Sequence, residues 1–326
     1  MPELLEFEEP IGVLLKEMEA LAMLPVTAER QAEIGSLRRR VQSIRGDLYR
    51  NLTPWQRVLV ARHPERPSVL EYVNMLFADF TEIHGDRRFG DDHAIVTGMA
   101  SYKNEPVLVV GHHKGGADTK QRIFRNFGYA RPEGYRKALR AMQLAQKFAR
   151  SIVVFVDTPA AYPGIESEER GIAEAIAVNL REMALLDVPI VVNVCGEGGS
   201  GGALGLAIGD RILMHEFAVY SVIPPEGCAA ILWRDSGRKV EAAAALKLTA
   251  PDLLARNIID EIVPEPVGGA HTNPSAAAAL LDGLLNRALT EVRAMASADR
   301  LDRRYQKFRQ MGRQDRDFRD ETAGPA

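Results

Sequence analysis

The chain has 326 residues, of which 46% are hydrophobic and 26% are charged, so its composition is that of a globular protein with a large core. A formal net charge of −3 gives no electrostatic reason to expect nucleic-acid binding. Two cysteines are too few for a disulfide framework or a four-thiolate zinc site, so we expect no metal on this chain and a reduced, cytoplasmic location.

The first 67 residues are expected to form a helical arm. Their acidic start lacks the basic and apolar regions of a secretory signal, and no apolar run in the chain is long enough to span a membrane. Apolar positions recur at helical spacing at Ile34, Leu37, Val41, Ile44 and Leu48. The arm is either a solvated helical hairpin or an element that contacts a partner subunit.

Residues 68–298 show alternating strand and helix patterns. Strands are expected at 94–100, 107–112, 152–157, 189–195, 211–215 and 218–223. A tight turn at 103–105 joins the first two, and a helix at 172–186 lies between two later strands. Repeated strand–helix–strand order predicts an α/β fold with a mostly parallel sheet.

The last part of the chain is expected to be helical and then flexible. Asn273 and Pro274 begin a helix that should reach about Ala298. Residues 299–326 are mostly charged and show no strand pattern, so we expect a flexible tail. The predicted organisation is therefore an arm at 1–67, a domain at 68–298 and a tail at 299–326.

The most informative stretch is residues 196–204, which read Gly-Glu-Gly-Gly-Ser-Gly-Gly-Ala-Leu. It follows a buried strand and precedes a short helix expected at 203–208. Glycines let the backbone approach a ligand closely, and N–H groups at a helix start have no helical partner. Such a turn suits the stabilisation of an anion or a developing oxyanion.

Motif spacing also permits a dinucleotide site. Gly196, Gly198 and Gly201 fit the pattern G-x-G-x-x-G, and Glu216 lies 20 residues after the first glycine. The expected helix is, however, shorter than the helix that usually follows this motif.

A serine nucleophile is another interpretation. Gly198, Ser200 and Gly202 fit G-x-S-x-G, in which case Ser200 would need His215 or His271 as its base. In a third interpretation the backbone N–H groups themselves do the chemistry. A plain turn without chemical function also fits the pattern.

Several segments resemble, in the same order, the alpha subunits of the carboxyltransferase in bacterial and plastid multi-subunit acetyl-CoA carboxylases. The segments are GHHKG at 111–115, NFG at 126–128, PEGYRKALR at 132–140, DTPAAYPG at 157–164, EERG at 168–171, GEGGSGGAL at 196–204, PEGCA at 225–229 and EPVGGAH at 265–271. Their collinearity from about residue 5 to about residue 308 makes the resemblance far more specific than any single motif.

The resemblance implies a crotonase/ClpP-like ββα spiral core and a role in moving the carboxyl group of carboxybiotin onto acetyl-CoA. The product would be malonyl-CoA, in the first committed step of fatty acid synthesis. Biotin would be covalently attached to a separate biotin carboxyl carrier protein, and this chain would bind no cofactor tightly. In the family scheme the biotin ureido nitrogen takes the methyl proton of acetyl-CoA.

The resemblance also implies partners. The chain would form an α2β2 tetramer with a beta subunit that carries the zinc and the main CoA site. This tetramer would work with biotin carboxylase and the biotin carrier protein.

The resemblance places the catalytic donors on the glycine-rich stretch. The N–H groups of Gly201 and Gly202 would form the oxyanion hole for biotin, and Gly198 and Gly199 would shape the approach to it. The loop after the strand at 152–157 would supply a second wall of the biotin site, formed by Ala160, Ala161, Tyr162 and Gly164.

Between Lys114 and Arg140 the chain has eight basic and two acidic residues. Lys114, Arg136, Lys137 and Arg140 are candidate contacts for CoA phosphates or for the carrier protein. The alternative is a solvated face whose charges pair with acids elsewhere in the chain.

The sequence departs from the family pattern at two positions near the predicted site. Ala160 stands where the family usually has glycine, so it would be strained if φ were positive, or its methyl group would narrow the pocket. Pro224 stands where the family usually has serine, which removes one N–H donor.

Three other functions remain open at this level. The chain could be a stand-alone crotonase-type acyl-CoA enzyme, a hydrolase that uses Ser200, or a non-catalytic subunit that only docks the carrier protein.

Overall fold

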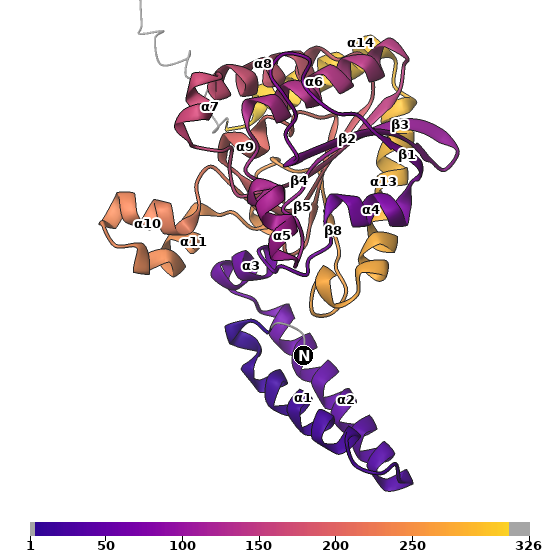
Figure 1. The fold of residues 1–326 in the computed structure, drawn as a ribbon, viewed down its shortest axis with the longest axis vertical. Coiled ribbons are helices and arrows are strands. Elements are labelled where there is room, and N and C mark those ends of the chain that lie inside the picture. Colours follow the sequence, from indigo (N-terminus) through magenta and orange to yellow (C-terminus); the bar gives the residue numbers. More distant parts are fainter. Residues whose placement is uncertain (1–3, 313–326) are drawn as a thin grey trace, which may run out of the picture.

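A computed structural model describes residues 4–312, which begin with a helical arm. Helices α1 (Glu9–Ala22) and α2 (Ala28–Arg50) pack side by side and project from the rest of the molecule (Figure 1). The hydroxyl of Thr27 caps α2 by accepting a hydrogen bond from the N–H of Arg30 at 3.3 Å. The buried residues between the two helices are Ile11, Leu14, Leu37 and Val41. The predicted helices are present, and α3 (Pro54–Ala61) already contacts the main body.

The main body is built around one mixed β-sheet. Within residues 4–312 its strands run in the order β1-β2-β3-β4-β5-β6-β8, and β7 pairs with the C-terminal end of β5. Strands β1 to β3 are antiparallel, whereas the pairings from β3 through β8 are parallel. The bounds are β1 (Ala78–Glu82), β2 (Ile95–Tyr102), β3 (Glu105–His112), β4 (Ser151–Thr158), β5 (Ile190–Gly199), β6 (Arg211–His215), β7 (Val219–Ser221) and β8 (Glu261–Val263). The mostly parallel α/β sheet expected from the sequence is confirmed.

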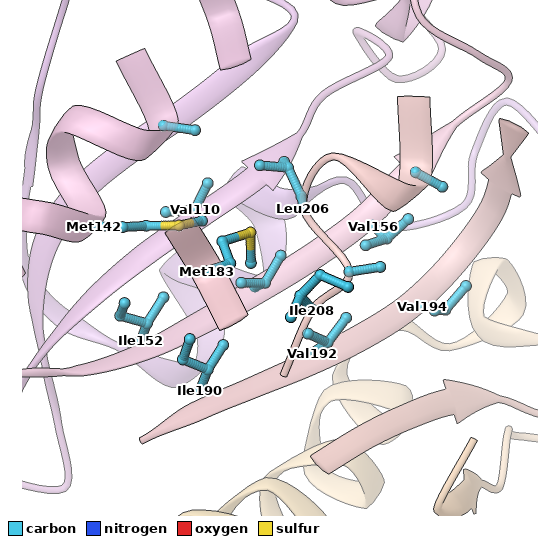
Figure 2. Packing of buried hydrophobic residues seen from close by; sticks show 14 of the residues in the cluster. Val110, Met142, Ile152, Val156, Met183, Ile190, Val192, Val194, Leu206 and Ile208 are labelled. Carbon is cyan, nitrogen blue, oxygen red and sulfur yellow. The ribbon is translucent and has the colours of Figure 1, made fainter. Parts of the chain in front are cut away.

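Helices cover both faces of the central strands. The covering helices are α4 (Val69–Leu76), α6 (Pro132–Lys147), α8 (Ile172–Leu185) and α13 (Pro274–Arg293). Two short helices, α5 (Thr119–Phe124) and α7 (Ile165–Glu169), lie in the connections that follow β3 and β4. Ile152 and Val154 of β4 join the cluster under α6 and α8, part of which Figure 2 shows. Val153 and Phe155 point the other way, toward α4 and α13. Strands buried on both faces explain the continuous apolar runs in the sequence.

Left-handed backbone marks two turns of the sheet. Lys103 and Asn104, with φ of 47° and 66°, join β2 and β3 in the predicted hairpin. Ser200, with φ of 53°, follows β5 directly. The helix predicted at 203–208 is wrong in position, because α9 occupies Ser200–Leu204. The glycines before it continue β5 by pairing with β7, which moves the turn later than Cys195.

The segment between β7 and β8 forms helices that the sequence analysis did not identify. Helices α10 (Pro225–Trp233) and α11 (Lys239–Leu246) project from the main body, and α12 (Ala250–Leu254) follows them (Figure 1). Ile231 and Leu232 on α10 are 72% and 63% exposed. The apolar residues of this part of α10 therefore do not form a stripe that faces the main body. For this reason helical periodicity in the sequence did not predict the helix.

The C-terminal segment contradicts two expectations. The helix expected to reach Ala298 ends at Arg293, and a separate helix α14 (Ser297–Gln310) follows. Arg304 of α14 is buried and binds Asp210 at 2.8 Å. Its guanidinium also donates to the carbonyls of Met183, Leu186 and Val188. The prediction of a flexible tail is therefore wrong for residues 299–310. The fully hydrogen-bonded guanidinium of Arg304 holds the polar helix α14 against the main body. Residues 313–326 of the predicted tail lie outside the described residues.

None of the helices within residues 4–312 is both long and apolar enough to cross a membrane.

Candidate functional site

The predicted anion site lies at the junction of β5 and α9. The left-handed backbone of Ser200 turns the chain from strand to helix, which puts Gly201 and Gly202 in the first turn of α9. N–H groups there have no carbonyl partner inside the helix. Within residues 4–312 neither N–H donates to backbone outside the helix. A β-carbon on Gly201 would meet only Cδ1 of Ile176, at 3.7 Å, among the described atoms.

The glycine turn packs directly against the end of β4. A β-carbon on Gly199 would lie 1.9 Å from the carbonyl oxygen of Pro159. One on Gly202 would lie 2.4 Å from the backbone of both Ala160 and Ala161. Only glycine fits at these two positions. The structure thus brings the two predicted walls of the site into contact.

The other predicted wall residues lie beside this contact. The guanidinium carbon of Arg131 lies 4.8 Å from the ring centroid of Tyr162. The backbone of Gly164 lies so close to that ring that a β-carbon would be 2.4 Å from it. Ala160 does not have a positive φ, so the strain that a positive φ would have caused is absent. Gly198 faces away from this wall, because its β-carbon would lie 2.7 Å from the ring of Tyr220 on β7.

A cleft of about 650 Å³ opens at the carboxyl ends of β4 and β5. Asp157 near the end of β4, Pro159 just after it, Glu197 of β5 and Lys114 after β3 line it. Pro224 lines it as well, at the N-cap of α10, where it offers no side-chain cap. The glycines at 198–202 adjoin the cleft but do not line it.

A chain of alternating charges runs along this cleft. The Nζ atom of Lys114 lies 2.7 Å from carboxylate oxygens of both Asp157 and Glu197. Arg62 binds Glu197 and Glu226, each at 2.6 Å. The N–H of Glu197 also donates to Asp157 at 2.9 Å. This network ties the ends of three strands to α3 and to the start of α10.

A second ion pair fixes β5 just before its glycines. Arg66 donates two hydrogen bonds to Glu265, at 2.8 and 2.5 Å, and both side chains are almost fully buried. The Nε atom of Arg66 donates to the carbonyl of Cys195 at 2.6 Å. The strand therefore enters the turn with its position set by side chains from distant parts of the chain.

Burial and neighbouring charges act in opposite directions on the pKa values of this network. Burial alone would raise the pKa of the Glu197 carboxyl, but Lys114 and Arg62 outweigh it and hold the pKa below its ordinary value. Burial alone would lower the pKa of Lys114, but Asp157 and Glu197 raise it. Burial lowers the pKa of His112 to about 3, so this residue is neutral at pH 7.

The candidate contact residues of the basic segment separate into two groups. Lys114 lies in the cleft, whereas Lys137 on α6 is completely buried and binds Asp91 at 2.6 Å. The expected contact of Lys137 with CoA or the carrier protein is therefore wrong, because no part of its side chain reaches the surface.

Arg136 and Arg140 line a different cleft, of about 400 Å³, between α6 and α8. Arg136 binds Asp86 at 2.8 Å. Arg140 donates to the carbonyls of His84 and Gly85, each at 2.9 Å. Within residues 4–312 Arg140 forms no direct ion pair, although Glu174 and Glu182 line the same cleft.

The two motif-based alternatives lack support in the geometry. Within residues 4–312 no histidine bonds to Ser200: His215 is completely buried, and His271 stacks on His63 with ring centroids 3.9 Å apart. A serine hydrolase would require such a base. Helix α9 has five residues, too few for a dinucleotide-binding helix, and Glu216 instead accepts a hydrogen bond from the Glu265 N–H.

Sequence reasoning did not identify Arg62, Arg66 or Glu226 as site residues. Arg66 and Glu265 are 199 positions apart, and local spacing cannot pair residues at that distance. The available signal was that Glu226 and Glu265 fall inside the segments that carry the family resemblance.

Comparison with known proteins assigns the chain to a family. The family described as acetyl co-enzyme A carboxylase carboxyltransferase-like matches residues 4–312. An acetyl-coenzyme A carboxylase carboxyl transferase subunit alpha from Geobacter metallireducens is 54% identical over 310 residues, covering 95% of this chain and 97% of that relative. The protein of the same name from Chlorobium phaeovibrioides is 52% identical over 324 residues, covering 94% of this chain and 96% of that relative.

Solved structures share the fold at low sequence identity. A transcarboxylase 12S structure with methylmalonyl-coenzyme A bound has a TM-score of 0.53 at 19% identity, covering 66% of this chain and 41% of that chain. A Pseudomonas malonate decarboxylase hetero-tetramer in complex with coenzyme A gives 0.54 at 17% identity, covering 67% and 86%. These neighbours have the crotonase fold, which confirms the fold class expected from the sequence.

Proposed function

The chain belongs to the acetyl-CoA carboxylase carboxyltransferase family as an alpha subunit, and we propose that its glycine turn stabilises the biotin side of carboxyl transfer. It is a subunit of a biotin-dependent carboxylase, and its activity is transfer of a carboxyl group to acetyl-CoA. As an alpha subunit it works with a beta partner in a multi-subunit complex.

The proposed catalytic groups are the N–H donors of Gly201 and Gly202. Carboxybiotin, when bound, would supply the carboxyl group to acetyl-CoA, and the biotin ureido oxygen would carry negative charge until the ureido nitrogen takes the methyl proton. Two fixed N–H donors at the start of α9 would stabilise that charge with little reorganisation. The observation that carries this proposal is the open backbone of Gly201, whose N–H has no backbone partner outside α9 in residues 4–312.

The residues around the turn have supporting roles in this proposal. Close packing of Gly199 and Gly202 on Ala160 and its neighbours sets the direction of the donors. The proposed wall of the biotin site consists of Ala160, Ala161, Tyr162 and Gly164, and Gly198 and Gly199 would shape the approach to it. Lys114, Arg136 and Arg140 stay as proposed contacts of CoA or the carrier protein.

The proposed partners are a beta subunit in an α2β2 tetramer, the biotin carboxyl carrier protein and biotin carboxylase. Zinc and the main CoA site would lie on the beta subunit. We propose that the arm at 1–67 contacts a partner subunit, because Val13, Met23 and Val26 are 62%, 82% and 79% exposed there. The buried free thiols of Cys195 and Cys228 suit the proposed cytoplasmic location.

The experiment compares Gly201→Pro with Gly201→Ala in the complete complex, by the rate of malonyl-CoA formation. Both substitutions add a β-carbon whose nearest contact outside the chain neighbours and the helix backbone is Cδ1 of Ile176, at 3.7 Å, but only proline removes the N–H. We expect Gly201→Pro to lower the rate about a hundredfold to a thousandfold, and Gly201→Ala to lower it far less. Gly202 is unsuitable for this test, because any β-carbon there would clash.

Ser200→Ala distinguishes the backbone mechanism from a serine nucleophile. The backbone mechanism predicts that Ser200→Ala keeps most of the activity, and that the chain without its beta partner forms no malonyl-CoA. Assembly of each variant is checked by size-exclusion chromatography. A properly assembled Ser200→Ala complex with less than about one thousandth of the wild-type rate, the scale of losing a nucleophile, would overturn the proposal.

A further inference from the structure

We propose that Tyr135 and Asn179 are positioning residues that hold α9 in the geometry its N–H donors require. This inference rests on the proposed role of the glycine turn. It concerns the buried side chains behind that turn, on α6 and α8.

Helix α9 is too short to hold its own backbone in place. Its five residues contain one turn, in which the Gly201 carbonyl accepts from the Gly205 N–H at 3.0 Å. The next N–H, that of Leu206, donates to Ala203 at 3.1 Å. The hydrogen bonds thus change from a spacing of four residues to a spacing of three. As a result, the carbonyl of Gly202 receives no backbone donor from the end of the helix.

Tyr135 supplies the missing donor from another helix. Its hydroxyl donates to the Gly202 carbonyl at 3.1 Å, and the residue is completely buried. The ring also lies against the backbone of Gly205, where a β-carbon would be 2.7 Å away. A buried carbonyl without a partner costs about 1–3 kcal/mol, so this bond favours one position of α9 over shifted ones.

Asn179 of α8 completes the support. Its Nδ2 atom donates to the carbonyl of Tyr135 at 3.1 Å and to the carbonyl of Gly205 at 3.0 Å. One buried amide therefore ties α6, α8 and the end of α9 together. Among the described residues, the carbonyls of Gly202 and Gly205 are thus both held by side chains.

Catalytic geometry connects this support to function. The Gly202 backbone is fixed on one side by Ala160 and Ala161, and on the other by Tyr135. Loss of the hydroxyl removes the hydrogen bond to the Gly202 carbonyl on one side, which permits a small shift of α9. A misplacement of about 1 Å at a catalytic group is sufficient for a rate loss of about a hundredfold.

The test is Tyr135→Phe in the complete complex, with Tyr102→Phe as the matched control. Tyr102 is also buried, and its hydroxyl donates to Asp282 at 2.7 Å, but its ring packs under α4 and α13 on the opposite face of the sheet. We expect Tyr135→Phe to lower kcat about tenfold while KM for acetyl-CoA changes less than about twofold. Amide hydrogen exchange in residues 199–206 should become faster in this variant alone. Tyr102→Phe should keep kcat within about twofold.

The result that overturns the inference is a kcat for assembled Tyr135→Phe equal to that of Tyr102→Phe. Gly201→Pro, measured in parallel, separates this failure from failure of the proposed site. If Gly201→Pro abolishes turnover and Tyr135→Phe does not change it, only the positioning role is wrong. If Gly201→Pro turns over normally, the proposed donors are wrong. If Tyr135→Phe does not assemble, the second variant is Asn179→Ser, which weakens the support at Gly205. We expect Asn179→Ser to give the same decrease in kcat. An unchanged kcat in this variant would contradict the inference.

Discussion

The basic residues between Lys114 and Arg140 take part in two ionic clusters, which lie in different parts of the molecule. The cleft cluster joins Lys114 to Asp157 and Glu197, beside the glycine turn. The loop cluster joins Lys137 to Asp91, and Arg136 to Asp86, and holds the loop between β1 and β2 on α6. The first is partly open to a cleft, whereas the lysine of the second has no exposed surface.

The difference shows that an excess of positive charge in sequence does not identify a contact surface. Both clusters start from lysines within one run of basic residues, yet the acids that meet them come from other strands and loops. The position of those acids decides whether a lysine faces an open cleft or closes a loop. Three measurements on variants of the two clusters test this contrast.

The largest effect is expected for Lys114→Met. It leaves the carboxylates of Asp157 and Glu197 facing each other without their shared cation. We expect a loss of about 3–4 kcal/mol in the free energy of unfolding and at least a tenfold lower turnover of the complex. Urea denaturation and malonyl-CoA formation measure the two effects. Lys103→Met, which removes a more exposed ion pair with Asp282, should cost less than about 1 kcal/mol.

A smaller effect, on stability alone, is expected for Lys137→Met. The substitution removes the buried ammonium group, so the carboxylate of Asp91 loses this partner. The free energy of unfolding should therefore fall by about 3 kcal/mol. Turnover per assembled complex should stay within about twofold of wild type, because this cluster does not border the glycine turn. A decrease in turnover as large as that of Lys114→Met would remove the functional distinction between the clusters.

The smallest effect is expected for Asp86→Asn, and it depends on pH. Burial would raise the pKa of Asp86, but hydrogen bonds from the N–H of Arg88 and from Arg136, together with those from Phe89 and Gly90, lower the pKa from 3.8 to about 2. A carboxyl with a lowered folded-state pKa stabilises the fold fully above its unfolded value, and loses that contribution as pH falls toward the folded value.

The free energy of unfolding of Asp86→Asn should therefore be about 2 kcal/mol below wild type at pH 7. The difference should shrink between about pH 4 and pH 2. Urea denaturation at pH 7, 5 and 3 measures it. A difference that stays constant down to pH 3 would show that the loop cluster is not stabilised by the Asp86 charge.

The features that sequence predicted well are those set by local patterns. The apolar runs that became β4 and β5 were recognisable because both faces of these strands are buried. The glycine turn was recognisable because it depends on residue types within nine positions. The family resemblance then identified the chemistry that motif spacing alone left open among several interpretations.

The features that sequence missed depend on distant residues. Tyr135 meets Gly202 across 67 positions, and no local pattern distinguishes that tyrosine from an ordinary core residue. The many charges of helix α14 predict a flexible tail, whereas Arg304 binds two other segments, residues 183–188 and Asp210. The start of α9 was misplaced because glycine gives weak preferences for both strand and helix.

The buried pair of Arg66 and Glu265 has a consequence for the order of folding during synthesis. Its two members are separated by 199 residues, and the carbonyl of Cys195 shares the same guanidinium. At about 5–20 residues per second, a ribosome adds Glu265 about 10–40 seconds after Arg66. Until then the arginine that fixes β5 has no carboxylate, and the strand leading into the glycine turn cannot complete its native contacts. The nascent chain must therefore stay unaggregated with its central strand incompletely anchored, which makes this subunit a candidate for chaperone dependence.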